Sequence, residues 1–251
     1  MHRSVSHTVA ELFNCKAATW KRKYDFGAAL SSRLVLFSEL VRKSCSPGAR
    51  ILDFGCGTGD LAIHLNRYRF RVTGCEISEK MLAIAKKSDP LQEVNWVLLP
   101  PNWKCMPFQS GFFDAIISAS VYEYLSDVRL AFRESARLLR PGGVLLLTVP
   151  NHRSVIRMIE RAIRPAALWF TSTPLPRFER KVDRFLLYLA LSKNRFSLQI
   201  WNSLATENGL VVDLTSTSRR DSLTMMACVR STVDGLTRTA ITNTDSFDSR
   251  K

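Results

Sequence analysis

Short apolar runs alternate with helix-like repeats along the first 150 residues. Each run reads as a buried strand, and the segment after it has apolar residues every three or four positions, as on one helix face. Alternation of this kind is typical of βαβ units built around a parallel sheet. The five predicted strands begin at Ile51, Phe70, Val94, Phe112 and Leu138. We therefore expect an α/β fold with a doubly wound sheet and helices on both faces.

The pattern changes after Val149. Residues 151–195 hold two apolar helical patterns separated by Pro174 and Pro176, which predicts a helical insertion after the fifth strand. The later elements are a helix at 197–207 and two closing strands at 210–214 and 223–229. These additions bring the predicted sheet to seven strands.

Helix-like spacing over Val9–Trp20 and Ala28–Val41 predicts an N-terminal helical cap, residues 1–48. The main domain is then 49–230, with 151–195 as a basic insertion that we expect to act as a substrate lid. Residues 231–251 are rich in Ser, Thr and Asp, and we expect them to form a disordered tail.

A glycine-rich loop, Asp53-Phe-Gly-Cys-Gly-Thr-Gly59, follows the first strand directly. Its D-x-G-x-G-x-G spacing differs from the G-x-G-x-x-G of dinucleotide folds, and it lacks the Lys of a phosphate-binding P-loop. The Asp53 carboxylate would repel a pyrophosphate but can hold an ammonium or hydroxyl group. The loop therefore predicts a nucleotide-like ligand without a pyrophosphate.

This loop resembles motif I of the class I S-adenosylmethionine-dependent methyltransferases. Later segments continue the resemblance in order: a second strand ending in Glu76, a loop in which Asn102 replaces the usual Asp, and the turn Pro141-Gly-Gly143. The likeness is greatest to the ubiquinone/menaquinone-biosynthesis-like branch. It implies a Rossmann-like fold, methyltransferase activity and S-adenosyl-L-methionine as the cofactor.

The resemblance also implies a cofactor site, in which the acid at the end of the second strand bonds the ribose hydroxyls. We expect this site to consist of Asp53, Gly55, Cys56, Gly57, Gly59, Glu76, Ile77, Asn102, Trp103 and Ser118. Tyr24 is a further candidate for covering the cofactor, from a segment that precedes motif I in this branch.

On the substrate side, Tyr124 stands where related O-methyltransferases have a histidine, which counts against a histidine base or a metal there. Glu123 and His152 are the remaining candidates for a catalytic base, by position alone. A surface histidine without a role is an equal alternative for His152. Methyl transfer also proceeds without a protein base where the acceptor is already nucleophilic.

The amino-acid composition indicates the class of protein and the compartment in which we expect it. The apolar fraction of 46% is typical of a globular protein, and the six cysteines form no metal-ligand spacing. The N-terminal residues lack an apolar signal segment, so we expect a cytoplasmic protein.

The net charge is +14, and it divides as +6 over residues 1–50, +1 over 51–150 and +7 over 151–251. The predicted cofactor core is therefore nearly neutral between basic flanks.

The first helix of the insertion has two distinct faces. Its basic face carries Arg153, Arg157, Arg161 and Arg164, and its apolar face carries Val155, Ile156, Ile159, Ala162 and Ile163. Most such helices bury the apolar face on their own domain and leave the cations in water. The alternatives are contact with an anionic membrane surface or cover over an anionic or lipid-like substrate. Nucleic acid is a third kind of partner that this basic face could bind. We rank it lower because the sequence shows no RNA-binding motif.

We therefore expect methyl transfer to a small-molecule acceptor, at a hydroxyl of an anionic or lipid-like metabolite. Transfer to nitrogen or carbon remains open. The alternatives are an RNA methyltransferase and a methyltransferase-like protein that binds the cofactor or a partner without turnover.

Overall fold

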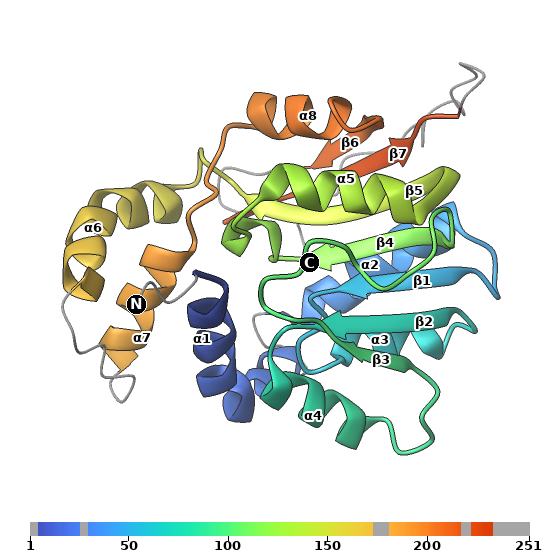
Figure 1. The fold of residues 1–251 in the computed structure, drawn as a ribbon, viewed down its shortest axis with the longest axis horizontal. Coiled ribbons are helices and arrows are strands. Elements are labelled where there is room, and N and C mark those ends of the chain that lie inside the picture. Colours follow the sequence, from blue (N-terminus) through green and yellow to red (C-terminus); the bar gives the residue numbers. More distant parts are fainter. Residues whose placement is uncertain (1–4, 26–29, 173–180, 217–221, 233–251) are drawn as a thin grey trace, which may run out of the picture.

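The computed structural model describes residues 5–25, 30–172, 181–216 and 222–232 of the 251-residue chain. The predicted tail lies outside these residues except for its first two positions. A single seven-stranded sheet forms the centre of the molecule (Figure 1). Its strands, in spatial order, are β3 (Asn95–Leu98), β2 (Arg71–Glu76), β1 (Arg50–Phe54), β4 (Phe113–Ala119), β5 (Leu139–Pro150), β7 (Leu223–Arg230) and β6 (Leu210–Ser216).

All neighbouring strands from β3 to β5 pair in parallel, and β7 is antiparallel to both β5 and β6. This is the predicted doubly wound α/β sheet of seven strands with helices on both faces. The chain order reverses between β1 and β4, so a crevice opens beyond their carboxyl ends, where ligands bind in such sheets.

Two apolar layers cover the sheet. One face is covered by α2 (Ser31–Ser44) and α3 (Asp60–Asn66), and the other by α5 (Val128–Leu138) and α8 (Leu198–Thr206). Helix α4 (Glu79–Ser88) follows β2 and is capped by the Ser78 hydroxyl, which accepts from the Met81 N–H at 3.2 Å.

Three helices lie beside the carboxyl ends of the strands, at the left of Figure 1. They are α1 (Val5–Trp20), α6 (Val155–Ser172) and α7 (Lys181–Leu191). A small third core joins α1 to α7 through Val9, Leu12, Leu187 and Leu191. The helical insertion after β5 is thus confirmed. Within the described residues, no helix is long and apolar enough to cross a membrane.

The Trp201 indole is the largest fully buried side chain among the described residues, and it packs against the rings of Tyr122, Phe132 and Phe196. We expect Trp201→Ala to lower the free energy of unfolding by about 3–5 kcal/mol, because it leaves a cavity in a packed core. Trp169, 74% exposed on α6, provides the matched control. Trp169→Ala should change stability by less than about 0.5 kcal/mol in the same denaturant titration. Equal losses in the two variants would contradict this.

Candidate functional site

A cavity of about 160 Å³ lies at the carboxyl ends of β1, β2 and β4. Its floor is made by residues 53–57, 75–77 and 119–121, which follow or end these three strands. It therefore occupies the crevice where the strand order reverses, and its floor includes the glycine loop.

The glycine loop turns sharply at two glycines with positive φ, and neither position has room for a side chain. Gly55 and Gly59 have φ of +77° and +80°, a region that favours glycine. A Cβ on Gly55 would lie 2.3 Å from Val121 Cγ2, and one on Gly59 would lie 2.6 Å from Trp96 Cη2. The loop can thus pack tightly between β4 and β3 while its backbone borders the cavity.

Glu76, at the end of β2, ties its own strand to this loop. One carboxylate oxygen accepts from the Gly57 N–H at 2.9 Å, and the other accepts from the N–H groups of Ile77 and Ser78 at 2.8 and 2.9 Å. Burial raises the pKa of the Glu76 carboxyl, while these three hydrogen bonds oppose the rise. The side chain is thereby held in one orientation at the cavity wall.

Asp53 lies beside Glu76 and is almost fully buried. One of its carboxylate oxygens has no hydrogen-bond partner. Burial first, and then the Glu76 carboxylate, raise the pKa of Asp53 to about 8. A buried carboxylate oxygen without a partner, next to a second carboxylate, favours a ligand that brings a positive charge or a hydrogen-bond donor.

The structure brings most of the predicted cofactor residues together. Asp53, Gly55, Cys56, Gly57, Glu76, Ile77, Asn102 and Trp103 all line the cavity. Gly59, the last residue of the loop, does not line the cavity and is the N-cap of α3. Ser118 does not line the cavity, because its buried hydroxyl donates to the Phe54 carbonyl oxygen at 3.1 Å and so links β4 to β1.

The N-terminal segment supplies a wall that the sequence indicated only in part. Tyr24 does line the cavity, and burial raises the pKa of its phenol to about 12. The Trp20 indole lies over the glycine loop, its Nε1 3.6 Å from where a Cβ on Gly57 would be. Val9 and Phe13 of α1 and Arg33 of α2 also line the cavity. The apolar spacing of these two segments predicts helices, but spacing does not tell what a helix packs against.

A hydrogen bond explains how α1 is positioned over the cofactor side. The Ser78 hydroxyl, which caps α4, also donates to the side-chain oxygen of Asn14 at 2.7 Å. The same Asn14 oxygen accepts from the Lys80 N–H at 3.1 Å. Helix α1 is therefore fixed to the segment that directly follows Glu76.

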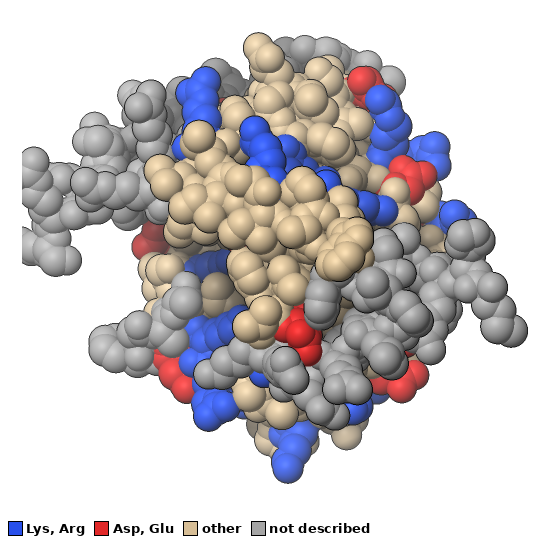
Figure 2. Space-filling model, turned by 90° about the vertical axis from the view of Figure 1, so that its left-hand side faces the viewer, with Lys and Arg blue, Asp and Glu red and all other residues tan. Residues whose placement is uncertain are grey.

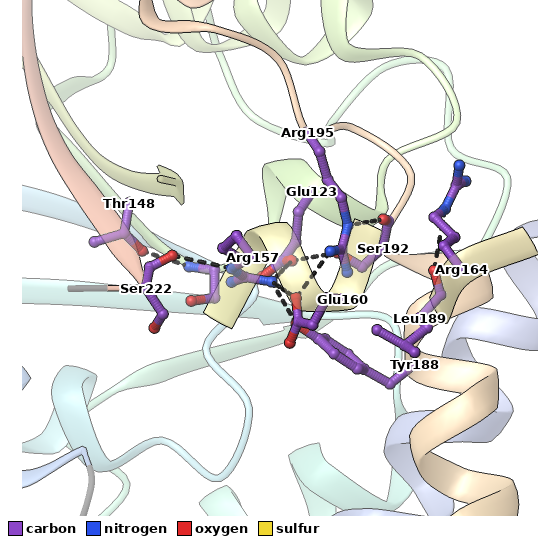
Figure 3. A network of polar contacts seen from close by, with 11 residues as sticks. Glu123, Thr148, Arg157, Glu160, Arg164, Tyr188, Leu189, Ser192, Arg195 and Ser222 are labelled. Carbon is purple, nitrogen blue, oxygen red and sulfur yellow. Dashed lines mark hydrogen bonds and ion pairs between the residues drawn. The ribbon is translucent and has the colours of Figure 1, made fainter. Parts of the chain in front are cut away.

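Glu123, a predicted catalytic base, does not reach the cavity. It lies in the short 3-10 helix η2 (Tyr122–Tyr124) and is buried. Its carboxylate accepts from the Ser192 hydroxyl at 2.5 Å and lies 3.4 Å from Arg157 Nη1 (Figure 3). A carboxylate committed to these partners is unsuited to take a proton from an acceptor, so we assign Glu123 to holding the insertion in place.

The buried network around Glu123 contains two carboxylates and two guanidinium groups (Figure 3). Glu160 Oε2 lies 3.0 Å from Arg157 Nη1 and 2.8 Å from Arg195 Nη1. Arg157 Nε also donates to the Ser222 carbonyl oxygen at 3.0 Å, and the Tyr188 hydroxyl contacts both Arg157 and Glu160. The network joins α6 and α7 to the main domain without leaving a net charge inside.

This network reverses the expected orientation of α6. Arg157 points inward, and Arg164 Nε donates to the Leu189 carbonyl oxygen of α7 at 3.2 Å. Val155, Ile156 and Ile159 on the opposite face are all more than half exposed. The prediction that α6 buries its apolar face and leaves these arginines in water is therefore wrong.

His152, the other predicted base, is also outside the cavity. Its pKa is lowered by partial burial and then by the nearby cations of Arg153 and Arg161. No described residue of 151–195 lines the cavity. Instead, α7 packs behind Phe13 and Tyr124, which do line it. The insertion thus supports the cavity wall from outside.

Comparisons with known proteins point to a methyltransferase domain. A family model described as a methyltransferase domain matches residues 52–147. The ubiquinone/menaquinone biosynthesis C-methyltransferase of Desulfotalea psychrophila is 34% identical over 47% of this chain and 49% of its own length. The malonyl-[acyl-carrier protein] O-methyltransferase of Legionella pneumophila is 29% identical over 58% and 50%. The chain spans about half the length of these curated relatives.

Among solved structures, the magnesium protoporphyrin IX methyltransferase of Synechocystis, determined with bound SAH, shares the fold. It superposes with a TM-score of 0.65 at 18% identity, over 90% of this chain and 99% of that chain. The matched domain, the glycine loop and the sheet order together make residues 52–147 similar to the class I S-adenosylmethionine-dependent methyltransferases, including those of ubiquinone/menaquinone biosynthesis, and this similarity indicates S-adenosylmethionine as the cofactor.

Proposed function

We propose that the protein transfers a methyl group from S-adenosylmethionine to an acidic hydroxyl, such as a carboxylic acid, phenol or enol, on a small lipid-like acceptor. The observation that carries this proposal is one cavity lined by two unlike sets of side chains. One set is the buried carboxylates of Asp53 and Glu76, and the other is apolar and aromatic.

The carboxylate set fits the polar groups of the cofactor. Glu76 is held by three backbone N–H groups, and we assign it to accepting hydrogen bonds from the ribose hydroxyls. Asp53, with its unpartnered oxygen, is assigned to the ammonium group. Asn102 lines the same cavity and offers an amide oxygen to the adenine amino group.

When bound, S-adenosylmethionine supplies an already activated methyl group, so the protein mainly has to orient the acceptor. The cavity is also lined by the apolar and aromatic side chains of Val9, Phe13, Val121, Tyr124 and Leu125. These side chains favour an acceptor with an apolar body, because they offer it contact area and exclude water.

The acidic groups that line the cavity near its apolar side chains are committed or hard to ionise. Asp127 caps α5, where one carboxylate oxygen accepts from the Leu130 N–H at 2.9 Å. Burial raises the pKa of the phenols of Tyr24 and Tyr124 above their ordinary value, and that of the Cys56 thiol likewise. Glu123 and His152 lie elsewhere. We therefore propose an acceptor that is nucleophilic without help from a protein base, and we favour a hydroxyl that ionises easily by itself.

A panel of acceptors tests the proposed function. The purified full-length chain is incubated with S-adenosylmethionine and long-chain carboxylic acids, phenols and short RNAs. We expect release of S-adenosylhomocysteine, and a product one methylene heavier, with an apolar acid or phenol. Methylation confined to RNA, to nitrogen or to carbon would contradict the proposal, as would binding of the cofactor without turnover on any acceptor.

Glu76→Gln should weaken binding of S-adenosylmethionine by about tenfold or more, because a hydrogen bond to a charged group contributes about 1.5–3 kcal/mol. Isothermal titration calorimetry provides the measurement. The matched control is Glu79→Gln, an exposed acid three positions along that does not line the cavity. Its affinity should equal that of the wild type. Unchanged binding by folded Glu76→Gln would refute the assignment.

Binding of S-adenosylmethionine should strengthen as the pH rises from 5.5 to 7.5, by up to about tenfold per pH unit. The reason is that Asp53, whose pKa is about 8 without ligand, must lose its proton to pair with an ammonium group. The same raised pKa means that the contribution of Asp53 to ligand-free stability is fully present below its ordinary pKa of 3.8 and is lost as the pH rises from there through about 8.

Calorimetry at several pH values, in buffers of different ionisation enthalpy, measures both the affinity and the protons released. Asp53→Asn is the control variant: its binding should be weaker and should lack this pH dependence. A profile that is the same in the wild type and in Asp53→Asn would contradict the role given to Asp53.

Glu123→Gln should lower the free energy of unfolding by about 1–3 kcal/mol, because it removes a buried negative charge that faces Arg157. Its affinity for S-adenosylmethionine should stay unchanged. Glu207→Gln is the control, since its ion pair with Arg129 is exposed and contributes at most about 1 kcal/mol. Denaturant titrations compare the two. Unchanged or increased stability of Glu123→Gln would contradict the structural role and favour a catalytic one.

A further inference from the structure

Helix α6 presents an apolar face to the outside of the molecule. Val155, Met158 and Trp169 are 65%, 57% and 74% exposed, and the neighbouring helix α7 adds two more exposed apolar side chains. We call this area the α6–α7 surface. Its members are Val155, Ile156, Met158, Ile159, Ile163 and Trp169 of α6, with Val182 and Phe185 of α7.

The α6–α7 surface cannot be buried by a simple roll of α6. The other side of the helix holds Arg157 and Glu160, both buried in the ion-pair network, and Ala167, which is fully buried. Turning the apolar side inward would expose these charges or leave them buried without partners, which is costly. The network therefore fixes the apolar face outward.

The exposed charges that α6 and the turn before it contribute beside the α6–α7 surface are positive. Arg153 and Arg161 flank it and are exposed, whereas Glu160, the one acid of α6, is buried and paired. On α7, the half-buried Asp183 is offset by its half-buried neighbour Arg184. Figure 2 shows this side of the molecule, with a broad tan area beside blue side chains. Apolar side chains bordered by exposed arginines are complementary to a bilayer that displays anionic headgroups.

We propose that the α6–α7 surface docks on an anionic lipid bilayer. Helix α6 lies in the plane of the membrane, its apolar side chains enter the boundary between headgroups and acyl chains, and Arg153 and Arg161 meet lipid phosphates. The 18 residues of α6 form a helix about 27 Å long at 1.5 Å per residue, which gives an extended line of contact. Exposed Trp169 suits the interface, because its ring is apolar and its N–H is polar.

The proposal places the cavity next to the membrane. Helix α1 forms part of the cavity wall through Val9 and Phe13, and it also packs on α7 through Leu187 and Leu191. One helix thus separates the membrane-facing pair from the cavity. A lipid-like acceptor would have a short path from the bilayer, although bilayer docking itself does not depend on the proposed methyl transfer.

Co-sedimentation of the full chain with phosphatidylcholine vesicles, with and without phosphatidylglycerol, tests the proposal. We expect the wild type to bind the anionic vesicles about tenfold or more strongly than vesicles of phosphatidylcholine alone, and we expect high salt to weaken this binding.

Ile156→Gln combined with Ile159→Gln should reduce binding to the anionic vesicles about tenfold or more. Arg161→Glu should abolish the preference for anionic vesicles. The control is Val35→Gln with Leu91→Gln, two exposed apolar residues on other elements, which should bind vesicles as the wild type does.

Two further measurements keep the outcome decisive. Calorimetry with S-adenosylmethionine on each variant shows whether it is folded, and it also separates failure of docking from failure of the proposed function. Light scattering without vesicles reports self-association. No binding to anionic vesicles, or equal binding by the wild type and the Ile156→Gln, Ile159→Gln variant, would overturn the proposal. A wild-type dimer that this variant converts to a monomer, without vesicle binding, would instead assign the surface to a second copy of the chain.

Discussion

The buried pairing of Arg157 with Glu123 and Glu160 determines how the insertion sits on the domain. Each charge would be costly inside the protein by itself, because desolvation of an unpaired ion exceeds what one hydrogen bond returns. With Arg195, which also pairs with Glu160, the two cations balance the two carboxylates, and together they connect η2, α6 and the segment after α7. The outward apolar face of α6 and the support that α7 gives to α1 both follow from this arrangement.

The sheet and the cofactor side could be predicted because their signals are local. The strand that ends in Asp53, the glycines after it and the acid at Glu76 are each readable within one βα unit. Backbone geometry then leaves little choice: Gly55 and Gly59 need positive φ, and Glu76 lies next to the loop because β1 and β2 pair in parallel. The family resemblance implies a cofactor role for Ser118, but its hydroxyl donates to the Phe54 carbonyl oxygen within the sheet.

The insertion could not be predicted in the same way, since its orientation depends on contacts between residues far apart in the sequence. Periodicity divides α6 correctly into a basic and an apolar face, but it cannot tell which face is inside. The deciding partners of Arg157 are 34 positions away at Glu123 and 65 positions away at Ser222. The prediction that Glu123 acts as a base is wrong for the same reason: its partners Arg157 and Ser192 lie 34 and 69 positions away in the sequence.

Net charge has a related weakness as a guide to partners. The chain carries +14, yet Arg157 and Arg195, two of the cations that suggested an anionic ligand, are neutralised inside the molecule. What a partner meets is the exposed remainder, in which Arg153 and Arg161 border an apolar surface. The cavity shows the opposite case: its floor holds Asp53 beside Glu76 although the whole protein is basic. Specificity therefore resides in these local arrangements, a negative floor for a cationic cofactor and a positive rim around an apolar face, and not in the overall sum of charges.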